Sequence, residues 1–457
     1  MLIVLEGLAA VVVLVVAFLV ARAVFHRPQL GVLLLAAFVP LNGLLAILPL
    51  PGLVAGWKEG LVIFTLGSAW IRRSRALGPR RPTLLMPWWP AAALFVVFGT
   101  ASALLSFGVI GFVGIKVTFF YLLLVAILWL APFDARDRDH LVTILMGMGA
   151  FTSLVGIAQL LAGPAALVAI GYEYGTQVRT SGGLLRTFST FNLPFPFGLY
   201  VMLSLLVGGA VALANPMRRR NLLFLCASPF MVVAMSSAIV RAALLGLAVG
   251  LIYMTIIRFR ALGGLLVILA ALVGAILPFV PKITSVFFSS SSLNERGGRW
   301  NEVIEKVRTH WLGEGLGSSG AAADRISSAQ GENITGSLGL STNYQPDNYY
   351  VKTALELGPI GLWAVLALLV TALIWCTRLS RTLPGQDGAL TLGVGASIVA
   401  AMFASLVATY FEIFPIDVYF WLLLGVVGCA AAQHESFSGP SPSVPAAAAS
   451  RRTSVSS

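Results

Sequence analysis

Apolar runs long enough to cross a bilayer recur along almost the whole sequence, and no other feature constrains the fold as much. A transmembrane helix needs about 20 mostly apolar residues, and about thirteen stretches meet this requirement. The predicted spans lie near 2–21, 30–50, 57–71, 88–106, 113–131, 141–162, 195–214, 221–237, 240–257, 261–280, 350–376, 389–411 and 415–432. Only 11% of the 457 residues are charged, whereas soluble domains carry about 25%. We therefore expect an all-α, polytopic membrane protein with about 12–13 transmembrane helices.

Arginines fall in alternate short loops, and this alternation orients the spans. Loops rich in Lys and Arg stay on the cytoplasmic side of a bacterial inner membrane. The arginines in these loops and in the tail are Arg22, Arg27, Arg72, Arg73, Arg75, Arg80, Arg81, Arg136, Arg138, Arg218, Arg219, Arg220, Arg258, Arg260, Arg378, Arg381, Arg451 and Arg452. The C-terminus is thus expected inside the cell. The formal net charge of +12 has the same origin, so nucleic-acid binding is not expected.

In this orientation the remaining polar segments face the periplasm, and 281–349 is the longest of them. The predicted regions are an N-terminal transmembrane bundle (1–280), a periplasmic catalytic loop (281–349), C-terminal transmembrane helices (350–432) and a disordered cytoplasmic tail (433–457). Within the loop, Trp300–Trp311 has the apolar spacing of an amphipathic helix. The stretch Gly313–Gly320 has the composition of a flexible connector. A proline-interrupted run, FNLPFPFG at 191–198, is expected to lie against protein rather than lipid, because irregular backbone at membrane depth needs such cover.

Several classes of chemistry lack their residues in this sequence. The histidines are His26, His140, His310 and His434, and none has a ligand partner at H-x-x-H or E-x-x-H spacing, so no metal or other cofactor is expected. No Gly-rich phosphate loop follows a strand, which argues against an ATP-driven transporter. The spans carry few ionisable residues, which argues against an ion or proton pathway.

Arginines at the periplasmic boundary are the first candidates for binding an anion. Arg241 has apolar residues on both sides, so it is either an arginine that snorkels to the interface or a buried cation held for a ligand. Arg299 follows two glycines and opens the predicted amphipathic helix, with a solvated surface charge as its alternative. Arg179 and Arg186 bracket RTSGGLLR. Arg179 fits an ordinary loop charge, whereas Arg186 approaches the membrane again beside Phe188.

Asp347 is the candidate carboxylate, because it ends the long loop directly before a predicted span. It either acts as a base or caps that helix, and the two roles are compatible. Arginines suit a diphosphate leaving group, since their planar fork bonds phosphate oxygens bidentately. A carboxylate can take the proton of an attacking hydroxyl. Because no nucleotide donor is present outside the cytoplasm, these residues together fit group transfer from a lipid-linked diphosphate.

The segments that carry these residues occur in the order found in a known family. SSAIVRAALLGLAVGL contains Arg241, GGRWNEVIEKV contains Arg299 and runs on to GEGLGSS, and PDNYYVKTALELGPIGL contains Asp347. In these motifs, over residues 140–375, the chain resembles the superfamily of O-antigen ligases and Wzy-type polymerases, which are membrane glycosyltransferases.

The resemblance implies roles for individual residues. Arg241 and Arg299 would bind the diphosphate of an undecaprenyl-linked glycan, without metal. Asp347 stands where the family commonly has a catalytic histidine followed by asparagine, so either a carboxylate replaces the imidazole or the base lies elsewhere. The alternative bases are Glu173, Glu356 and His310. The further residues expected to bind substrate are Arg186, Arg179, Asn348, Tyr349 and Glu173.

The resemblance leaves the acceptor open. A polymerase would extend one undecaprenyl-diphosphate-linked oligosaccharide with another, making exopolysaccharide or O-antigen on the periplasmic face, in a membrane shared with a chain-length regulator protein. A ligase would transfer the glycan to lipid A-core. The aspartate in place of histidine and the open acceptor loop favour the polymerase. A flippase for the same lipid-linked glycan is the alternative from another class, and it would show cations lining a cavity within the spans.

Overall fold

The fold is that of a computed structural model of the chain. It describes residues 15–48, 52–75, 83–276, 305, 307–309, 311–320, 322–323, 325–326 and 346–438. The predictions for Arg299 and His310, and those for most of the Trp300–Trp311 helix and most of the tail, fall outside these residues.

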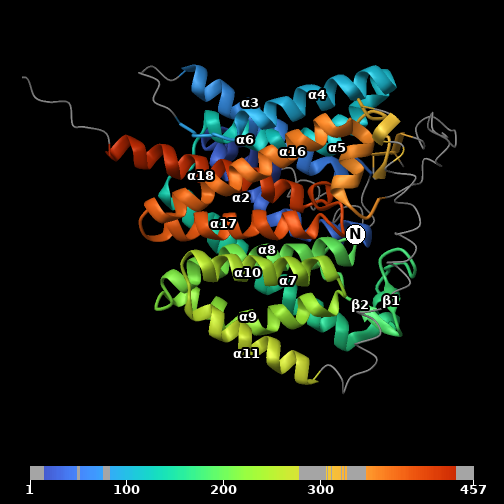
Figure 1. Cartoon of the computed structure of the whole chain (residues 1–457), viewed down its shortest axis with the longest axis vertical. Coiled ribbons are helices and arrows are strands. Elements are labelled where there is room, and N and C mark those ends of the chain that lie inside the picture. Colours follow the sequence, from blue (N-terminus) through green and yellow to red (C-terminus); the bar gives the residue numbers. More distant parts are fainter. Residues whose placement is uncertain are drawn as a thin grey trace, which may run out of the picture.

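Almost every described residue belongs to a helix (Figure 1). The α-helices are α2 (Pro28–Phe38), α3 (Trp57–Arg75), α4 (Trp89–Phe107), α5 (Phe112–Phe119), α6 (Leu123–Leu130), α7 (Ala135–Ala169), α8 (Pro194–Ala214), α9 (Arg219–Ser237), α10 (Arg241–Ile257), α11 (Ala261–Ile276), α16 (Tyr349–Thr382), α17 (Gly385–Ala404) and α18 (Ile416–Ser438). The 3-10 helices are η1 (Val39–Ala46), η2 (Gly52–Gly56), η3 (Gly108–Gly111), η4 (Phe120–Leu122) and η6 (Tyr410–Glu412). The strands are β1 (Arg179–Ser181) and β2 (Leu184–Arg186).

The lengths and hydropathy of these helices confirm the predicted all-α, polytopic membrane architecture. By length and composition, eight helical stretches among the described residues can cross a membrane. They are Pro28–Ala46, Trp89–Leu130, Ala135–Ala169, Pro194–Ala214, Arg219–Ser237, Tyr349–Thr382, Gly385–Ala404 and Ile416–Ser436. Val15–His26, Arg241–Ile257 and Ala261–Leu272 are shorter apolar helices. The larger predicted number of spans stays a prediction. Most of 2–21 lies outside the described residues, the predicted span 57–71 lies in α3, which is not among the eight, and the spans 240–257 and 261–280 correspond to shorter helices.

The stretch Trp89–Leu130 is folded back on itself, as the two spans predicted there require. The hydroxyl of Thr83, shortly before α4, donates a hydrogen bond of 2.8 Å to the carbonyl oxygen of Trp129 in α6. The start of α4 and the end of α6 therefore lie at the same end of the molecule. At the reversal, the chain passes so close to α4 that a Cβ on Gly111 would lie 2.4 Å from the carbonyl oxygen of Ala103.

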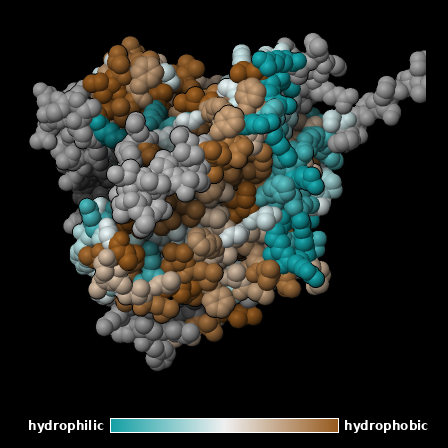
Figure 2. Space-filling view, turned by 180° about the vertical axis from the view of Figure 1, so that it is seen from behind, coloured by the Kyte–Doolittle hydropathy of each residue, from teal (hydrophilic) through white to brown (hydrophobic). Residues whose placement is uncertain are grey.

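Polar residues gather at two opposite ends of the helices. The arginine end comprises the first turns of α7, α9 and α17 and the last turns of α16 and α18. The hairpin end comprises β1, β2 and the first turns of α8, α10 and α16 (Figure 1). In Figure 2 a hydrophilic band follows the arginine end, and hydrophobic residues cover much of the face beside it. This distribution is expected of helices that present apolar side chains to lipid between two polar boundaries.

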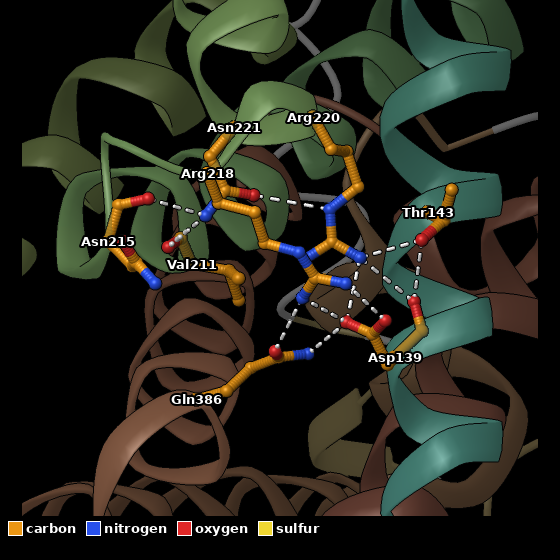
Figure 3. A network of polar contacts seen from close by, with 8 residues as sticks. All are labelled: Asp139, Thr143, Val211, Asn215, Arg218, Arg220, Asn221 and Gln386. Atoms are coloured by element: carbon orange, nitrogen blue, oxygen red, sulfur yellow. Dashed lines mark hydrogen bonds and ion pairs between the residues drawn. The ribbon is translucent and has the colours of Figure 1, made fainter.

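A charged network joins three helices at the arginine end (Figure 3). Asp139 of α7 accepts hydrogen bonds from both terminal nitrogens of Arg218, at 2.8 and 2.7 Å. It also accepts from Arg220 at 2.8 Å and from the amide of Gln386 at 2.8 Å. Positive charges are unfavourable in the first turn of a helix, because the helix dipole is positive there. The negative charge of Asp139 therefore compensates the charges of the arginines at the start of α9.

The residue before Asp139 makes a second connection. Arg138 is 3% exposed and forms a bidentate pair with Asp387 of α17, with both N···O distances at 2.8 Å. It also donates to Gln433 of α18 at 2.7 Å. Loops that the positive-inside rule placed on one side of the membrane thus meet at one end of the structure.

The FNLPFPFG run packs against protein, as predicted. Phe191 is 3% exposed and Phe197 is fully buried. The turn before the run is held by Gln159 of α7, whose side-chain oxygen accepts from the backbone N–H of Ser189 at 2.7 Å. The Gln159 amide donates to the carbonyl oxygen of the same residue at 2.8 Å. Side-chain hydrogen bonds thereby replace the backbone partners that this irregular segment lacks.

Candidate active site

Arg186 contacts the turn between α9 and α10, and Arg241 directly follows that turn. The backbone N–H of Thr187 donates to the carbonyl oxygen of Ser237 at 3.2 Å, and their hydroxyls lie 2.6 Å apart. Arg186 donates its Nε–H to the carbonyl oxygen of Ala238 at 3.3 Å. Helix α10 begins with Arg241. The hairpin strand β2 therefore delivers Arg186 to the turn that presents Arg241.

The strands place two like charges opposite one another. Arg179 and Arg186 are cross-strand partners, and the turn between them contains Gly182 and Gly183, both with positive φ. Burial lowers the pKa of Arg186, and the charge of Arg179 lowers it further. Like charges opposite each other destabilise a strand pair, yet an arginine remains charged at neutral pH. A half-buried cation under such repulsion gains from an anionic ligand.

The end of α17 connects Arg241 to the start of α16. Helices α10 and α17 run in opposite directions, and a Cβ on Gly246 would lie 3.2 Å from the carbonyl oxygen of Ala400. Arg241 therefore lies beside the last residues of α17. The carbonyl oxygen of Ser405, directly after α17, accepts from the backbone N–H of Tyr349 at 2.9 Å. Arg241 and the start of α16 thus meet at the same end of α17.

Asn348, not Asp347, caps α16. The side-chain oxygen of Asn348 accepts from the backbone N–H groups of Tyr350 at 2.9 Å and Val351 at 3.2 Å. The capping role considered for Asp347 was therefore wrong, because the neighbouring amide performs it. Asp347 is exposed and lies one residue before the cap. Its carboxylate is thus at the hairpin end, where an acceptor hydroxyl can reach it.

The other predicted residues differ in their surroundings. Tyr349 is 3% exposed, and its ring packs edge-on against Phe411 with the centroids 5.1 Å apart. Arg179 is exposed and donates to the carbonyl oxygen of Thr176 at 2.9 Å. Glu173 is also exposed, within the turn that leads into β1. The structure therefore brings Arg186, Arg241 and the start of α16 together more closely than it does Arg179 or Glu173.

A segment of the long loop, residues 311–320, packs on α16 where proline interrupts the helix. Pro359 has no N–H, so the carbonyl oxygen of Leu355 loses its helical partner. The backbone N–H of Glu314 donates to that oxygen at 2.9 Å, and the N–H of Gly315 donates to the carbonyl oxygen of Glu356 at 2.9 Å. The two family-like motifs GEGLGSS and LELGPIGL are therefore joined by backbone hydrogen bonds.

The prediction of a flexible connector over Gly313–Gly320 was wrong, because this segment packs on α16. Leu316 is 2% exposed. Gly313 has φ of 73°, and a Cβ there would lie 2.4 Å from the backbone of Glu356. Glycine in this segment permits close packing on α16 rather than freedom of movement.

Beneath this segment, Glu356 forms a cluster with Lys352 and Glu412, two charged residues that were not predicted to belong to the site. The ammonium of Lys352 lies 2.5 Å from Glu356 and 2.7 Å from Glu412, and each of the three side chains is at most 4% exposed. Glu356 was predicted only as an alternative base. Its carboxylate is instead buried and paired with Lys352. The spacing of Lys352 and Glu356, one helical turn apart inside an apolar run, was the available signal. Glu412 gave none, because its partner comes from another helix.

A comparison with family models identifies part of the chain. A model described as O-Antigen ligase matches residues 222–366, which include Arg241, Asp347 and the kink of α16. No individual curated protein matches the chain. Residues 222–366 thus form an O-antigen ligase family domain, in agreement with the resemblance of their motifs to the superfamily of O-antigen ligases and Wzy-type polymerases.

Proposed function

We propose that the protein is a polymerase that joins undecaprenyl-diphosphate-linked oligosaccharide repeat units into polysaccharide on the periplasmic face of a bacterial inner membrane. The O-antigen ligase family domain supports a glycan-handling enzyme of this general type. The observation that carries the proposal is the meeting of Arg241 and the start of α16 at one end of α17. The arginines concentrated at the opposite end support a periplasmic position of the hairpin end, because loops rich in Lys and Arg stay on the cytoplasmic side.

The proposed reaction needs a cation and a base close to one anomeric carbon. The acceptor hydroxyl oxygen forms a bond to that carbon, and the bond from the carbon to the diphosphate oxygen breaks. Arg241 and Arg186, with Arg299 as a further proposed member, neutralise the departing undecaprenyl diphosphate. The proton of the acceptor hydroxyl passes to the carboxylate of Asp347.

Asp347 is an unusual base, since a carboxylate is a weaker base than the imidazole that the resemblance leads one to expect at this position. In the proposed reaction, the leaving group therefore departs before much proton transfer is needed. Asp347 then mainly orients the acceptor hydroxyl and receives its proton late.

Reconstitution with defined acceptors tests the proposal. Purified protein in proteoliposomes is given lipid-linked oligosaccharide alone, or the same donor with lipid A-core. A polymerase converts the donor alone into a ladder of longer lipid-linked chains. A ligase product appears only when lipid A-core is present. Movement of the donor across the bilayer without a new glycosidic bond would instead identify a flippase and refute the proposal.

A further inference from the structure

The buried triad, formed by Lys352, Glu356 and Glu412, lies directly behind the candidate active site. A buried ion cluster contributes little net stability, because its attraction must first offset the loss of hydration. The triad is also unequal, with two carboxylates around one ammonium. A role in holding neighbouring segments in place accounts better for such a group than stability does.

The carboxylate of Glu356 bonds in two directions. One oxygen, Oε2, faces Lys352. The other, Oε1, accepts from the backbone N–H of Gly317 at 3.2 Å, and from the N–H and hydroxyl of Ser319 at 3.1 Å each. A Cβ on Gly320 would approach Cε of Lys352 to 2.7 Å. The 311–320 segment is therefore fitted closely around the Lys352–Glu356 pair.

Glu412 extends the connection to the end of α17. It closes η6, and Phe411 beside it packs on Tyr349, the first residue of α16. The triad thus joins three separate segments: the 311–320 part of the long loop, the first turns of α16, and η6. Asp347 lies at the point where these segments meet the hairpin end.

We propose that Glu356 is a positioning residue, which fixes the 311–320 segment against the first turns of α16 and so sets the position of Asp347 relative to the glycan. This inference rests on the proposed glycosyl transfer. Glu356 does not touch the reacting atoms. It acts through the N–H groups of Gly317 and Ser319 and through Lys352.

The test combines hydrogen exchange with kinetics on full-length protein in lipid nanodiscs. In Glu356→Gln, the amide keeps the shape of the side chain but can accept on one side only. Its NH2 group then faces either the ammonium of Lys352 or the donors of Gly317 and Ser319, so one set of contacts is lost. Exchange of the 311–320 peptide should rise, while that of a peptide from the later part of α16 stays unchanged. The kcat per folded molecule should fall about 10–100-fold with KM for the lipid-linked donor nearly constant, since misplacement of a reacting group costs rate rather than binding.

Asp139→Asn is the matched control, because it disrupts a comparable charged network at the arginine end. It should change neither exchange of the 311–320 peptide nor kcat per folded molecule. Ser319→Ala removes one hydrogen bond to Glu356 and carries the test if Glu356→Gln does not fold. It should raise exchange of the same peptide and lower kcat a few-fold.

Unchanged exchange of 311–320 in a folded variant, or a kcat equal to that of wild type, would overturn the positioning role. A wild-type protein without transferase activity would refute the proposed function instead. The exchange measurement needs no activity, so the two failures are distinguishable.

Discussion

The backbone N–H of Tyr349 donates to the carbonyl oxygen of Ser405, 2.9 Å away, and this bond fixes the start of α16 to the end of α17. Because α10 packs along α17, the same end also receives Arg241. A cation and a carboxylate from distant parts of the sequence are thus held by rigid helices rather than by loops alone.

Replacing Arg241 with alanine should remove about 3–4 kcal/mol of transition-state stabilisation, by analogy with the loss of an oxyanion-hole donor. Lysine should restore only part of it, because the bidentate geometry is lost. The measurement is kcat/KM for the lipid-linked donor. Arg179→Ala is the control, since an exposed charge of this kind contributes about 0–1 kcal/mol. Equal effects of the two alanine variants would argue against a special role for Arg241.

Arg186→Ala should weaken donor use by about 1.5–3 kcal/mol, the range for hydrogen bonds to charged groups. The loss of donor use in this variant should depend only weakly on salt concentration. An exposed arginine would show a stronger dependence, because salt screens a half-buried side chain such as Arg186 less. The check is the salt dependence of KM in this variant and in Arg179→Ala. A substitution that leaves KM and kcat unchanged at low salt would remove Arg186 from the site.

Two substitutions test the role of Asp347 as the base. Asp347→Asn should abolish transfer, because the neutral amide neither orients the acceptor hydroxyl as the carboxylate does nor accepts its proton. Asp347→His should retain some activity, with a pH profile shifted upward, since histidine titrates at about 6.5 and aspartate at about 3.9. Asparagine at 347 with wild-type activity would show that the carboxylate has no catalytic part, and Glu173 and His310 would become the candidates.

Glu412 should make the stability of the protein depend on pH. Burial raises the pKa of Glu412 above its ordinary value of 4.5, against the opposing effect of Lys352 and with a further rise from Glu356. The folded protein then binds this proton more tightly than the unfolded chain does. Stability from this group is greatest below pH 4.5 and is lost as the pH rises through the raised pKa. Thermal unfolding in detergent should show this loss in wild type. Glu412→Gln should flatten it, and an equally steep loss in that variant would assign the dependence to another group.

Asp139→Asn should destabilise the fold by about 1–3 kcal/mol, because the bonds of its carboxylate to Arg218, Arg220 and Gln386 join three helices and are only partly exposed. Arg219→Ala, an exposed change in the same turn, should cost less than about 0.5 kcal/mol. The check is the unfolding midpoint of each variant in the same detergent. Similar midpoints would show that the network adds little to stability.

Much of this architecture can be predicted from the sequence, because the length and hydropathy of a stretch are enough to identify a transmembrane helix. The reversal near Gly111 and the break at Gly163–Pro164 both fall at predicted span ends. Arg241 was likewise found at a helix start, as its position between apolar residues indicated. These features are local, so a single stretch of sequence contains their cause.

What the sequence did not reveal depends on partners from elsewhere in the chain. The Gly182–Gly183 pair is typical of two-residue hairpin turns. The hairpin was nevertheless not predicted, because only the arginines of this segment were considered. The glycine-rich segment 313–320 was predicted from its composition to be a flexible connector. It is instead held by backbone hydrogen bonds to carbonyl oxygens of α16 near the kink at Pro359. The burial of Lys352 becomes understandable only when Glu412 is brought beside it.

The most direct test of the account follows both products of one reaction in proteoliposomes that contain only the purified protein and lipid-linked oligosaccharide. Release of undecaprenyl diphosphate and growth of lipid-linked glycan should rise together in wild type, one diphosphate for each new glycosidic bond. Both should disappear in Arg241→Ala and in Asp347→Asn, while folding and donor binding in Asp347→Asn persist. Glycan growth that continues at the wild-type rate in both variants would contradict the account.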